Sequence, residues 1–221
     1  MSRKGIDGSR FQVILDEAGN ITHPMDWDKT QAQGINYVCW RMTVGSYYSD
    51  KSFPLAYAAC VKYGWPLLPY HVTTDDPWKD QYKKIEEVLT KVASQPSPIV
   101  SIIQDLEVKR GTAELITSNV QHLDQCVIDE LGRSSWIYSN AYVDEYLLAW
   151  SGWAHIPFIA ASWLNVNQGQ RSTSVTGSKP VLPKLKGFQY PVAWQWSADK
   201  PIPNNMGKVY GAQSQSIDQQ M

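Results

Sequence analysis

Ser101-Ile102-Ile103-Gln104-Asp105-Leu106-Glu107 is an apolar run that ends in two carboxylates, spaced i and i+2. If the run is a β-strand, its alternate side chains share a face, so Asp105 and Glu107 point the same way with Cβ atoms roughly 6–7 Å apart. Two acids at the carboxyl end of a buried strand are costly to place there for stability alone. The segment therefore predicts a buried strand with an acid pair at its carboxyl end.

Paired acids of this kind suit the cleavage of glycosidic bonds. One acid protonates the leaving oxygen, and the other stabilises or attacks the sugar. The alternative is a solvated pair that caps the strand or binds Lys109 and Arg110, and the short D-x-E spacing does not separate the two interpretations. The aromatic content is the compositional outlier, with 10 Trp and 12 Tyr among 221 residues. Aromatic faces stack on sugar rings, although tryptophan also fills large cores.

On both sides of the acid pair, short apolar runs alternate with helical patterns, which predicts a parallel sheet with crossover helices. We expect a hairpin over 11–21, strands over 5–9, 35–42, 66–72, 99–108, 135–140, 157–163 and 192–198, and helices over 26–33, 52–64, 77–92 and 112–131, with Asp76 capping the third helix. The chain has no internal repeat or linker. It therefore favours a single α/β domain over residues 1–221, an irregular, TIM-like (β/α) barrel rather than an open doubly wound sheet.

Polar side chains fall at the carboxyl ends of separate predicted strands. In a barrel those ends meet on one face, where catalytic groups collect. The convergence favours a functional acid pair over a solvated one. The residues concerned are Asp7, Tyr70 and His71, Asp105 and Glu107, Tyr138 and Asn140, Ser162 and Trp163, and Gln195 and Trp196. The segment 165–191 between the last two strands is long for a plain loop and predicts a rim or lid.

Several classes of protein are excluded by what the sequence lacks. A net charge of −1 without a basic run argues against nucleic acid as a partner, and the absence of 18 consecutive apolar residues argues against a membrane helix. The cysteines and histidines show no metal-ligand spacing, and no nucleotide or cofactor motif is present, so we expect no metal and no cofactor. The N-terminus lacks an apolar h-region, so no signal peptide is visible; either the protein starts in a cytoplasm or its signal peptide has been removed.

The order of the segments resembles a known family, the Chalaropsis-type lysozymes of glycoside hydrolase family 25. Gly5-Ile6-Asp7-Gly8-Ser9 is similar to its G-I-D-V-S opening, and Gln104-Asp105-Leu106-Glu107 to its D-x-E catalytic strand. Further matching segments, in family order, are Gly34–Val38 with Arg41, Gly45 and Asp50, then Ala58–His71, Trp136–Asn140, Phe158–Trp163 and Trp194–Trp196. Each segment is weak alone, but seven in order are specific.

The chain also departs from the pattern. Gly8 replaces the usual Val, and Arg41 stands where Lys is common. The segment 13–24 looks like an insertion. The family usually ends in a V-D-x-N-like segment whose Asp lines the pocket. Here Asp218 is the preferred match and Asp199 its competitor.

The resemblance implies a muramidase that hydrolyses the β-1,4 bond between N-acetylmuramic acid and N-acetylglucosamine in bacterial peptidoglycan, with retention. Glu107 would be the general acid, with a raised pKa, and Asp105 would stay ionised to stabilise positive charge at the reacting centre. The nucleophile is either the substrate's own acetamido group, oriented by Asp105, or Asp105 itself, and the sequence leaves this open.

The resemblance also implies a set of substrate-binding residues: Asp7, Tyr70, His71, Tyr138, Trp163, Gln195, Trp196 and Asp218. Asp7 would be a third acid in the pocket, or alternatively a strand-end turn residue that bonds local N–H groups. Tyr138 would bond the acetamido group or an acid. Tyr70 and His71 alternatively only pack or orient their neighbours. Trp194 and Trp196 lie two apart on a strand, and at most one is expected to face the sugar unless the strand bends.

Two other functions compete with the muramidase. A chitinase-like N-acetylhexosaminidase carries further Asp residues before D-x-E, where this chain has Ile103 and Ser101. A non-catalytic glycan-binding domain on a lysozyme-like scaffold is the alternative outside enzymes, and intact Asp7, Asp105 and Glu107 speak against it. Together with the lack of a visible signal peptide, the resemblance implies a phage-type lysin or a protein whose signal peptide has been removed. We expect a monomer that acts on bacterial peptidoglycan in the cell wall.

Overall fold

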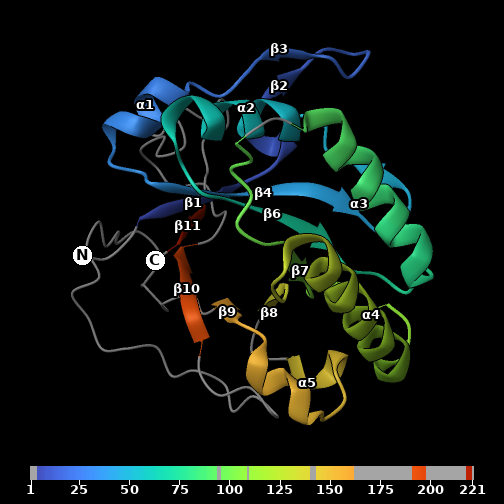
Figure 1. The fold of residues 1–221 in the computed structure, drawn as a ribbon. Helices are drawn as coiled ribbons and strands as arrows, with labels where there is room; N and C mark the ends of the chain where they lie inside the picture. Colours follow the sequence, from blue (N-terminus) through green and yellow to red (C-terminus); the bar gives the residue numbers. More distant parts are fainter. Residues whose placement is uncertain are drawn as a thin grey trace, which may run out of the picture.

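The computed structural model describes residues 4–93, 96–108, 110–139, 143–161, 191–197 and 218–220; for 160–161, 191–197 and 218–220 the description is limited to the backbone. Within these residues a curled, mostly parallel sheet lies at the centre and helices lie around its outside (Figure 1). The predicted α/β class is confirmed. In the described residues no helix is long and apolar enough to cross a membrane.

The strands and helices follow the predicted alternation as far as β9. The strands are β1 (Gly5–Gly8), β2 (Ile14–Leu15), β3 (Ile21–His23), β4 (Tyr37–Val44), β5 (Tyr48–Ser49), β6 (Leu67–Val72), β7 (Ile103–Asp105), β8 (Trp136–Ser139), β9 (Phe158–Ala161), β10 (Pro191–Ser197) and β11 (Asp218–Gln220). The helices are α1 (Trp27–Ala32), α2 (Phe53–Tyr63), α3 (Trp78–Val92), α4 (Ala113–Leu131) and α5 (Val143–Tyr146), with 3-10 turns η1 (Arg10–Gln12) and η2 (Ser151–His155).

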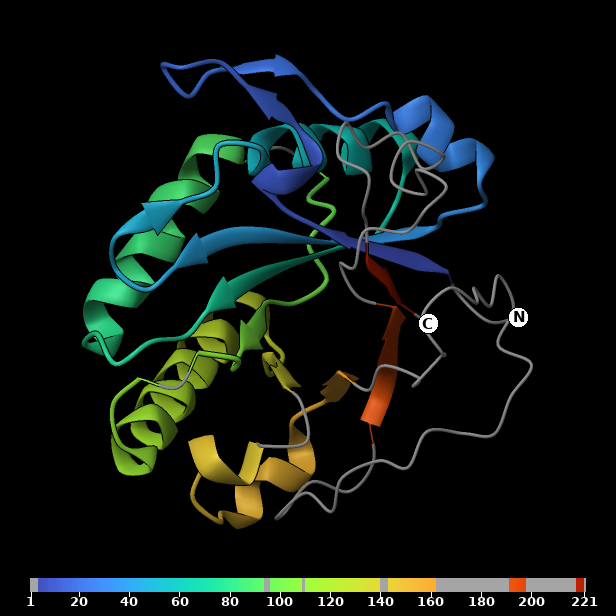
Figure 2. The same ribbon diagram turned by 180° about the vertical axis from the view of Figure 1, so that it is seen from behind.

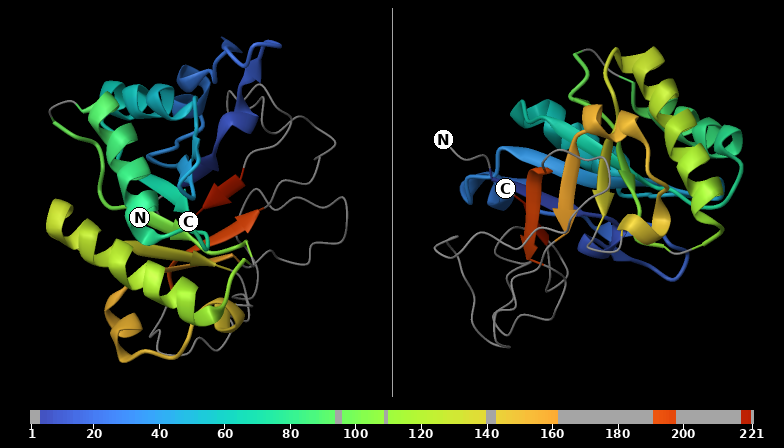
Figure 3. Two further views of the ribbon diagram at one scale, coloured as in Figure 1. Left: turned by 90° about the vertical axis from the view of Figure 1, so that its right-hand side faces the viewer. Right: turned by 90° about the horizontal axis from the view of Figure 1, so that it is seen from below.

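The sheet order is β1-β11-β10-β9-β8-β7-β6-β4-β5, and β1 also pairs in parallel with β4. Strand β1 thus has β4 on one side and β11 on the other, which gives the sheet its curl (Figure 3). The regular strand–helix repeat of a TIM barrel is not kept, because β11 runs antiparallel to both β1 and β10. The expectation of a TIM-like barrel is therefore met only at the level of a curled, mostly parallel α/β sheet.

Helices α3 and α4 pack side by side against the sheet (Figure 1). Helix α4 begins where the Thr112 side chain accepts a hydrogen bond from the Leu115 N–H, and it ends at Gly132 with φ 68°. Helix α3 does not begin as predicted. Its N-cap is Pro77, and the Asp76 carboxylate instead accepts hydrogen bonds from the backbone N–H and hydroxyl of Ser46, at 2.8 and 2.9 Å. The predicted Asp76 cap is wrong because this distant loop competes for the carboxylate.

The predicted hairpin is present as β2 and β3, which project from the body of the molecule (Figure 2). Its turn is closed by hydrogen bonds between Asp16 and Asn20. The structure also explains why Gly8 replaces the valine of the family pattern. A Cβ atom at Gly8 would lie 2.4 Å from the ring of Trp40, its register partner on β4. A valine at position 8 is therefore incompatible with the position of Trp40.

The core has one part between the sheet and the helices and another inside the curl. The inner cluster contains Tyr37, Cys39, Leu68, Ile103, Tyr138 and Ile159. Their strands, β4, β6, β7, β8 and β9, therefore point alternate residues inward. The strand predicted over 99–108 is shorter than expected, since β7 covers only Ile103–Asp105, and Glu107 lies beyond its carboxyl end.

Candidate active site

The backbone after β7 is held on both sides, which fixes the acid pair. The Asp105 carbonyl accepts a hydrogen bond from the Thr73 N–H at 3.0 Å, and the Leu106 N–H donates to the Tyr138 carbonyl at 2.9 Å. The Leu106 side chain is 2% exposed and packs with residues of α4 and α5. Because neighbouring side chains in extended backbone point to opposite faces, burying Leu106 outward directs Asp105 and Glu107 to the inner face.

Two further hydrogen bonds support this segment. The Ser139 hydroxyl donates to the Leu106 carbonyl at 2.9 Å, and the Tyr146 hydroxyl donates to the Glu107 carbonyl at 3.3 Å. Residues from β6, β8 and α5 thus hold the acid pair in position even though the strand itself ends at Asp105. The charge of Glu107 acts on Asp105, which is consistent with the predicted shared face, although Glu107 lies beyond the end of the strand.

Asp105 is buried, with 8% of the residue exposed, and within the described part of the chain its Oδ1 atom has no hydrogen-bond partner. Burial raises the pKa of Asp105 well above its usual value, the charge of Glu107 raises it further, and Arg41 lowers it. In the free protein these surroundings favour the protonated form of Asp105, whereas the family resemblance implies an ionised Asp105. The physical reason is that Asp105, not Glu107, is the deeper of the two acids.

Glu107 is exposed as a residue, yet the surrounding protein displaces water from its carboxyl group and raises its pKa. The Tyr138 hydroxyl donates a hydrogen bond to this carboxylate, which lowers the pKa and offsets part of the rise. Because the two acids influence each other, they titrate as a pair rather than independently. The site therefore contains one acid at its rim and a second acid beneath it, and the pKa values of both are raised.

Tyr70 lies between the acid pair and the first strand. Its hydroxyl is within electrostatic reach of Asp7, Asp105, Asp50 and Arg41, and burial raises its pKa well above the usual value. Asp7 and Asp105 therefore flank the same tyrosine. The structure brings together three of the predicted residues near the acid pair, Asp7, Tyr70 and Tyr138.

Arg41 and Asp50 are functional neighbours that the sequence singled out only through the family resemblance. The Arg41 Nε donates to the Asp50 Oδ2 at 2.9 Å, and Asp50 is 2% exposed. Asp50 raises the pKa of Arg41 against the effect of burial, so the guanidinium stays charged beside Asp105 and Tyr70. Only the adjacency of β4 and β5 reveals this ion pair, and no local pattern in the sequence predicts it.

His71 is placed away from the acid pair, on the side of the sheet that faces α3. Its Nδ1 lies 2.8 Å from the Thr43 hydroxyl, and its Nε2 lies 2.9 Å from the Gln81 Oε1. Since an amide oxygen only accepts, Nε2 carries the proton and His71 is neutral. Burial lowers its pKa to about 4. The geometry favours the alternative in which His71 orients its neighbours.

For the remaining predicted residues, either only the backbone position is described or the residue lies outside the described part of the chain. Asp218 on β11 is the register partner of Asp7 on β1, and Gln195 and Trp196 lie on β10, beside β9 and β11. Trp163, Asn140, Asp199 and most of the predicted 165–191 loop lie outside the described residues.

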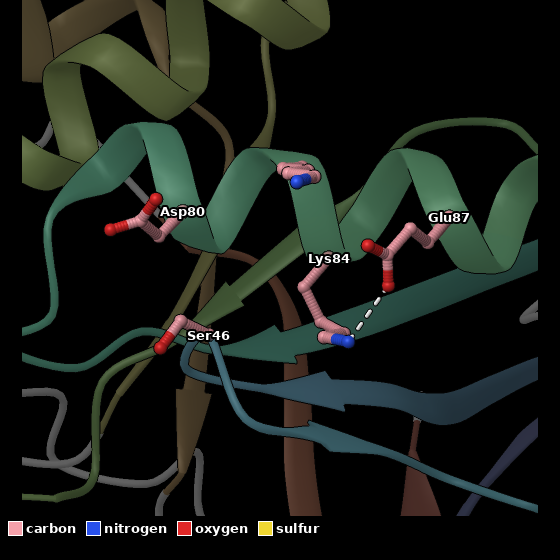
Figure 4. Close-up of a pocket in the computed structure, with 5 residues that line it drawn as sticks. Ser46, Asp80, Lys84 and Glu87 are labelled. Carbon is pink, nitrogen blue, oxygen red and sulfur yellow. Dashed lines mark hydrogen bonds and ion pairs between the residues drawn. The ribbon is translucent and has the colours of Figure 1, made fainter.

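A surface pocket of about 280 Å³ lies apart from the acid pair, between the turn after β4 and helix α3 (Figure 4). It is lined by Ser46, Asp80, Lys83, Lys84 and Glu87, and the Lys84 Nζ lies 2.8 Å from the Glu87 Oε2. Its lining contains none of the predicted site residues, so we do not assign it to the active site. Among the described residues, no group of three or more His, Cys, Asp and Glu side chains is arranged to hold a metal ion.

Comparison with solved structures supports the fold. A family 25 glycosyl hydrolase from Bacillus anthracis has a TM-score of 0.69 at 15% identity, with 99% of this chain and 88% of that chain covered. The bacterial lysozyme from Streptomyces coelicolor gives 0.69 at 17% identity, with 100% and 92% covered. The catalytic domain of endolysin ply40, from bacteriophage P40 of Listeria monocytogenes, gives 0.66 at 14% identity, with 100% and 93% covered.

No curated protein matches the chain in sequence. The sequence model described as Glycosyl hydrolases family 25, however, matches residues 6–205. This match spans most of the chain and confirms the family indicated by the order of the motifs. The chain therefore belongs to family 25 of the glycosyl hydrolases, and it is a glycoside hydrolase.

Proposed function

We propose that this glycoside hydrolase is a lysozyme that cleaves the β-1,4 bond between N-acetylmuramic acid and N-acetylglucosamine in bacterial peptidoglycan, with retention. The observation that carries the proposal is the buried Asp105 with the rim acid Glu107 and its partner Tyr138, in a family 25 chain. Neighbours of the same fold include lysozymes, an endolysin and an autolysin in complex with a synthetic peptidoglycan ligand.

Glu107 is the general acid in this proposal. Burial raises its pKa, which favours the proton-bearing form of the carboxyl group, and its position at the rim suits contact with the leaving oxygen. Tyr138 then acts as a positioning residue, because its hydroxyl orients the carboxyl group.

Asp105 orients the acetamido group of the substrate. The unpartnered Oδ1 is a ready acceptor for an amide N–H, and such a hydrogen bond favours the ionised form. Substrate binding would thereby shift the shared proton to Glu107 and leave Asp105 charged beside the reacting carbon. The acetamido oxygen attacks that carbon, the glycosidic C–O bond breaks, and the leaving oxygen takes the proton from Glu107. Water then attacks the same carbon and opens the cyclic intermediate, while the Glu107 carboxylate takes a proton from the water. Two inversions restore the starting configuration.

Asp7, Tyr70 and Asp218 complete the pocket in this proposal. Asp218 is preferred over Asp199, because its backbone lies in register with Asp7. Gln195, Trp196 and Trp163 are proposed to contact the sugar from the β9 and β10 side. The chain is proposed to act as one catalytic domain over 1–221, an irregular (β/α) barrel that works as a monomer on the bacterial cell wall.

The test is product analysis with purified protein and peptidoglycan. Borohydride reduction and mass spectrometry should show N-acetylmuramic acid at the new reducing ends, and early proton NMR should show the β anomer. Reduced N-acetylglucosamine ends would favour the chitinase-like N-acetylhexosaminidase, and an initial α anomer would exclude the acetamido route. Tight glycan binding without cleavage would favour the non-catalytic alternative.

A further inference from the structure

Four side chains form what we name the arginine–aromatic cluster: Arg10 and Phe11 in the turn after β1, Arg41 on β4 and Tyr48 on β5. The Arg10 Cζ lies 5.0 Å from the Phe11 ring centroid and 5.8 Å from that of Tyr48. The Arg41 Cζ lies 5.3 and 5.4 Å from the same two centroids. Cation–π attraction operates at these separations, so two guanidinium groups share two rings.

The exposed part of the cluster is held rigidly. Phe11 is 56% exposed, although it lies in the short turn η1 rather than at a chain end. Ser9 caps this turn by accepting a hydrogen bond from the Phe11 N–H, and the Gln12 side chain accepts one from the Ser9 N–H. The Asp50 Oδ2 also accepts a hydrogen bond from the Arg10 N–H at 3.0 Å. An aromatic ring is therefore kept in solvent by a capped and anchored turn.

The cluster carries an unneutralised positive charge. Arg41 is paired with Asp50, but the exposed Arg10 side chain has no carboxylate within ion-pair distance in the described residues. An exposed ring beside a free guanidinium suits a ligand that has both an apolar face and an anionic group.

The cluster flanks the acid pair. Sheet order runs β8-β7-β6-β4, with β1 next to β4. Glu107 is bonded to Tyr138 on β8, whereas Arg41 extends from β4 and its charge reaches Asp105. In this order β4, which carries Arg41, and β8, which carries the Glu107 partner Tyr138, lie on opposite sides of β7, which carries Asp105.

We propose that the arginine–aromatic cluster is a subsite for a carboxylate-bearing N-acetylmuramoyl unit, in which Phe11 stacks on the sugar and Arg10 binds the carboxylate. The inference rests on the proposed function, since it concerns the same glycan strand. Of the two sugars in that strand, only N-acetylmuramic acid bears an acidic substituent, the lactyl group. The carboxylate is either the free lactyl group or a carboxylate of the peptide attached to it, and both present the same chemistry to Arg10.

The test compares Arg10→Gln with the wild-type protein on three substrates. These are intact strands, strands whose peptides have been removed by an amidase, and amidase-treated strands whose lactyl carboxylates have been converted to neutral methylamides. The matched control is Arg133→Gln, an exposed arginine in the loop that leads into the amino end of β8. Phe11→Ala reports on stacking separately from charge.

We expect the wild-type protein to prefer charged over neutral strands by about tenfold in kcat/KM, chiefly through KM, as a charge-assisted contact predicts. Arg10→Gln should remove this preference, Arg133→Gln should keep it, and Phe11→Ala should weaken cleavage of all three substrates alike. If the wild-type protein cleaves amidase-treated strands faster than intact strands, Arg10 binds the lactyl carboxylate. If it cleaves intact strands faster, Arg10 binds a carboxylate of the peptide.

An Arg10→Gln protein with an unchanged preference, or an Arg133→Gln protein with the same loss, would overturn the subsite. A wild-type protein that cleaves all strands equally would also overturn it, while leaving the proposed function intact. Absence of cleavage of any strand by the wild-type protein would instead overturn the proposed function.

Discussion

Asp50 and Asp105 are both buried carboxylates near Arg41, but they are bonded very differently. Asp50 uses both oxygens. Its Oδ2 accepts from the Arg10 N–H and the Arg41 Nε, and its Oδ1 accepts from the backbone N–H and hydroxyl of Ser52. Asp105, on the inner face of the curl, has an Oδ1 with no hydrogen-bond partner in the described residues.

This difference in hydrogen bonding distinguishes Asp50, a structural acid, from Asp105, the acid that we propose to bind the substrate. The four hydrogen bonds of Asp50 compensate the hydration that its buried charge has lost, and they connect three parts of the chain. A buried carboxyl oxygen without a partner is costly, and it gains most when a ligand supplies the missing donor. Activity should therefore depend on Asp105 and its partner Glu107, and stability on Asp50.

The largest effect is expected for Glu107→Gln. The amide cannot transfer a proton, so the rate of peptidoglycan cleavage should fall by a factor of about 10³ or more. The side chain lies at the exposed rim, so the free energy of unfolding should stay within about 0.5 kcal/mol of the wild-type value. Turbidity clearing and denaturant unfolding measure the two effects, with Glu130→Gln, an exposed acid on α4, as control. Near-normal clearing by a folded Glu107→Gln protein would remove the assignment.

Asp105→Asn is expected to lower the cleavage rate at least about a hundredfold, because charge stabilisation at the transition state is lost. Stability should be unchanged or higher, since a carboxyl group that is costly to ionise in the interior is replaced by a neutral amide. A clear loss of stability would place Asp105 with Asp50 as a structural acid.

The same variant should alter the pH profile. In the wild-type pair the second proton leaves against the charge already present, which holds the alkaline limb of kcat/KM at a high pH. With asparagine at position 105 only Glu107 titrates, without a charged neighbour, so the alkaline limb should move to lower pH. A limb that stays in place or moves upward would contradict the coupling of the two acids.

Strong local signals made much of the fold predictable. Thr112 and Gly132 mark the two ends of α4, and the alternation of Asp105, Leu106 and Glu107 correctly places one apolar side chain outward between two acids. These features depend on residues close together in the chain, so a single sequence is sufficient to identify them.

What could not be predicted depends on contacts between distant segments. The capture of Asp76 by Ser46, 30 positions away, is one example, and the fit of the Trp40 ring over Gly8 is another. Tyr70 and His71 are adjacent on a strand, so the period of two requires that they face opposite sides. The sequence does not say which of the two faces the pocket, because the strand is apolar on both faces.

Asp50→Asn is expected to lower the free energy of unfolding by about 2 kcal/mol, because the charge that holds the Arg41 and Arg10 contacts is removed from the interior. Denaturant unfolding measures the loss, and Asp26→Asn, whose ion pair with Lys29 is at the surface, is the control. A stability loss no larger than that of the control would mean that Asp50 does not have the structural role that its hydrogen bonds indicate.

The smallest effect concerns His71, the buried titratable group on the helix-facing side of the sheet. Its pKa is lowered to about 4 by burial, against smaller opposing effects of Gln81 and Asp76. The unfolded chain therefore binds a proton that the folded chain does not between pH 6.5 and 4, and stability falls as the pH falls through this range. From pH 7 to pH 5 this should cost about 1–2 kcal/mol, a cost that His71→Gln removes.

Unfolding free energies of the wild-type protein and His71→Gln at pH 7 and pH 5 provide the measurement, with His23→Gln on the exposed hairpin as control. Because His71 contacts Thr43 and Gln81 rather than the acid pair, the cleavage rate at pH 7 should change less than about threefold. An equal pH dependence in wild type and His71→Gln would show that His71 is not held neutral by the fold. A large loss of activity with unchanged stability would mean that His71 takes part in the active site, although it lies on the helix-facing side of the sheet.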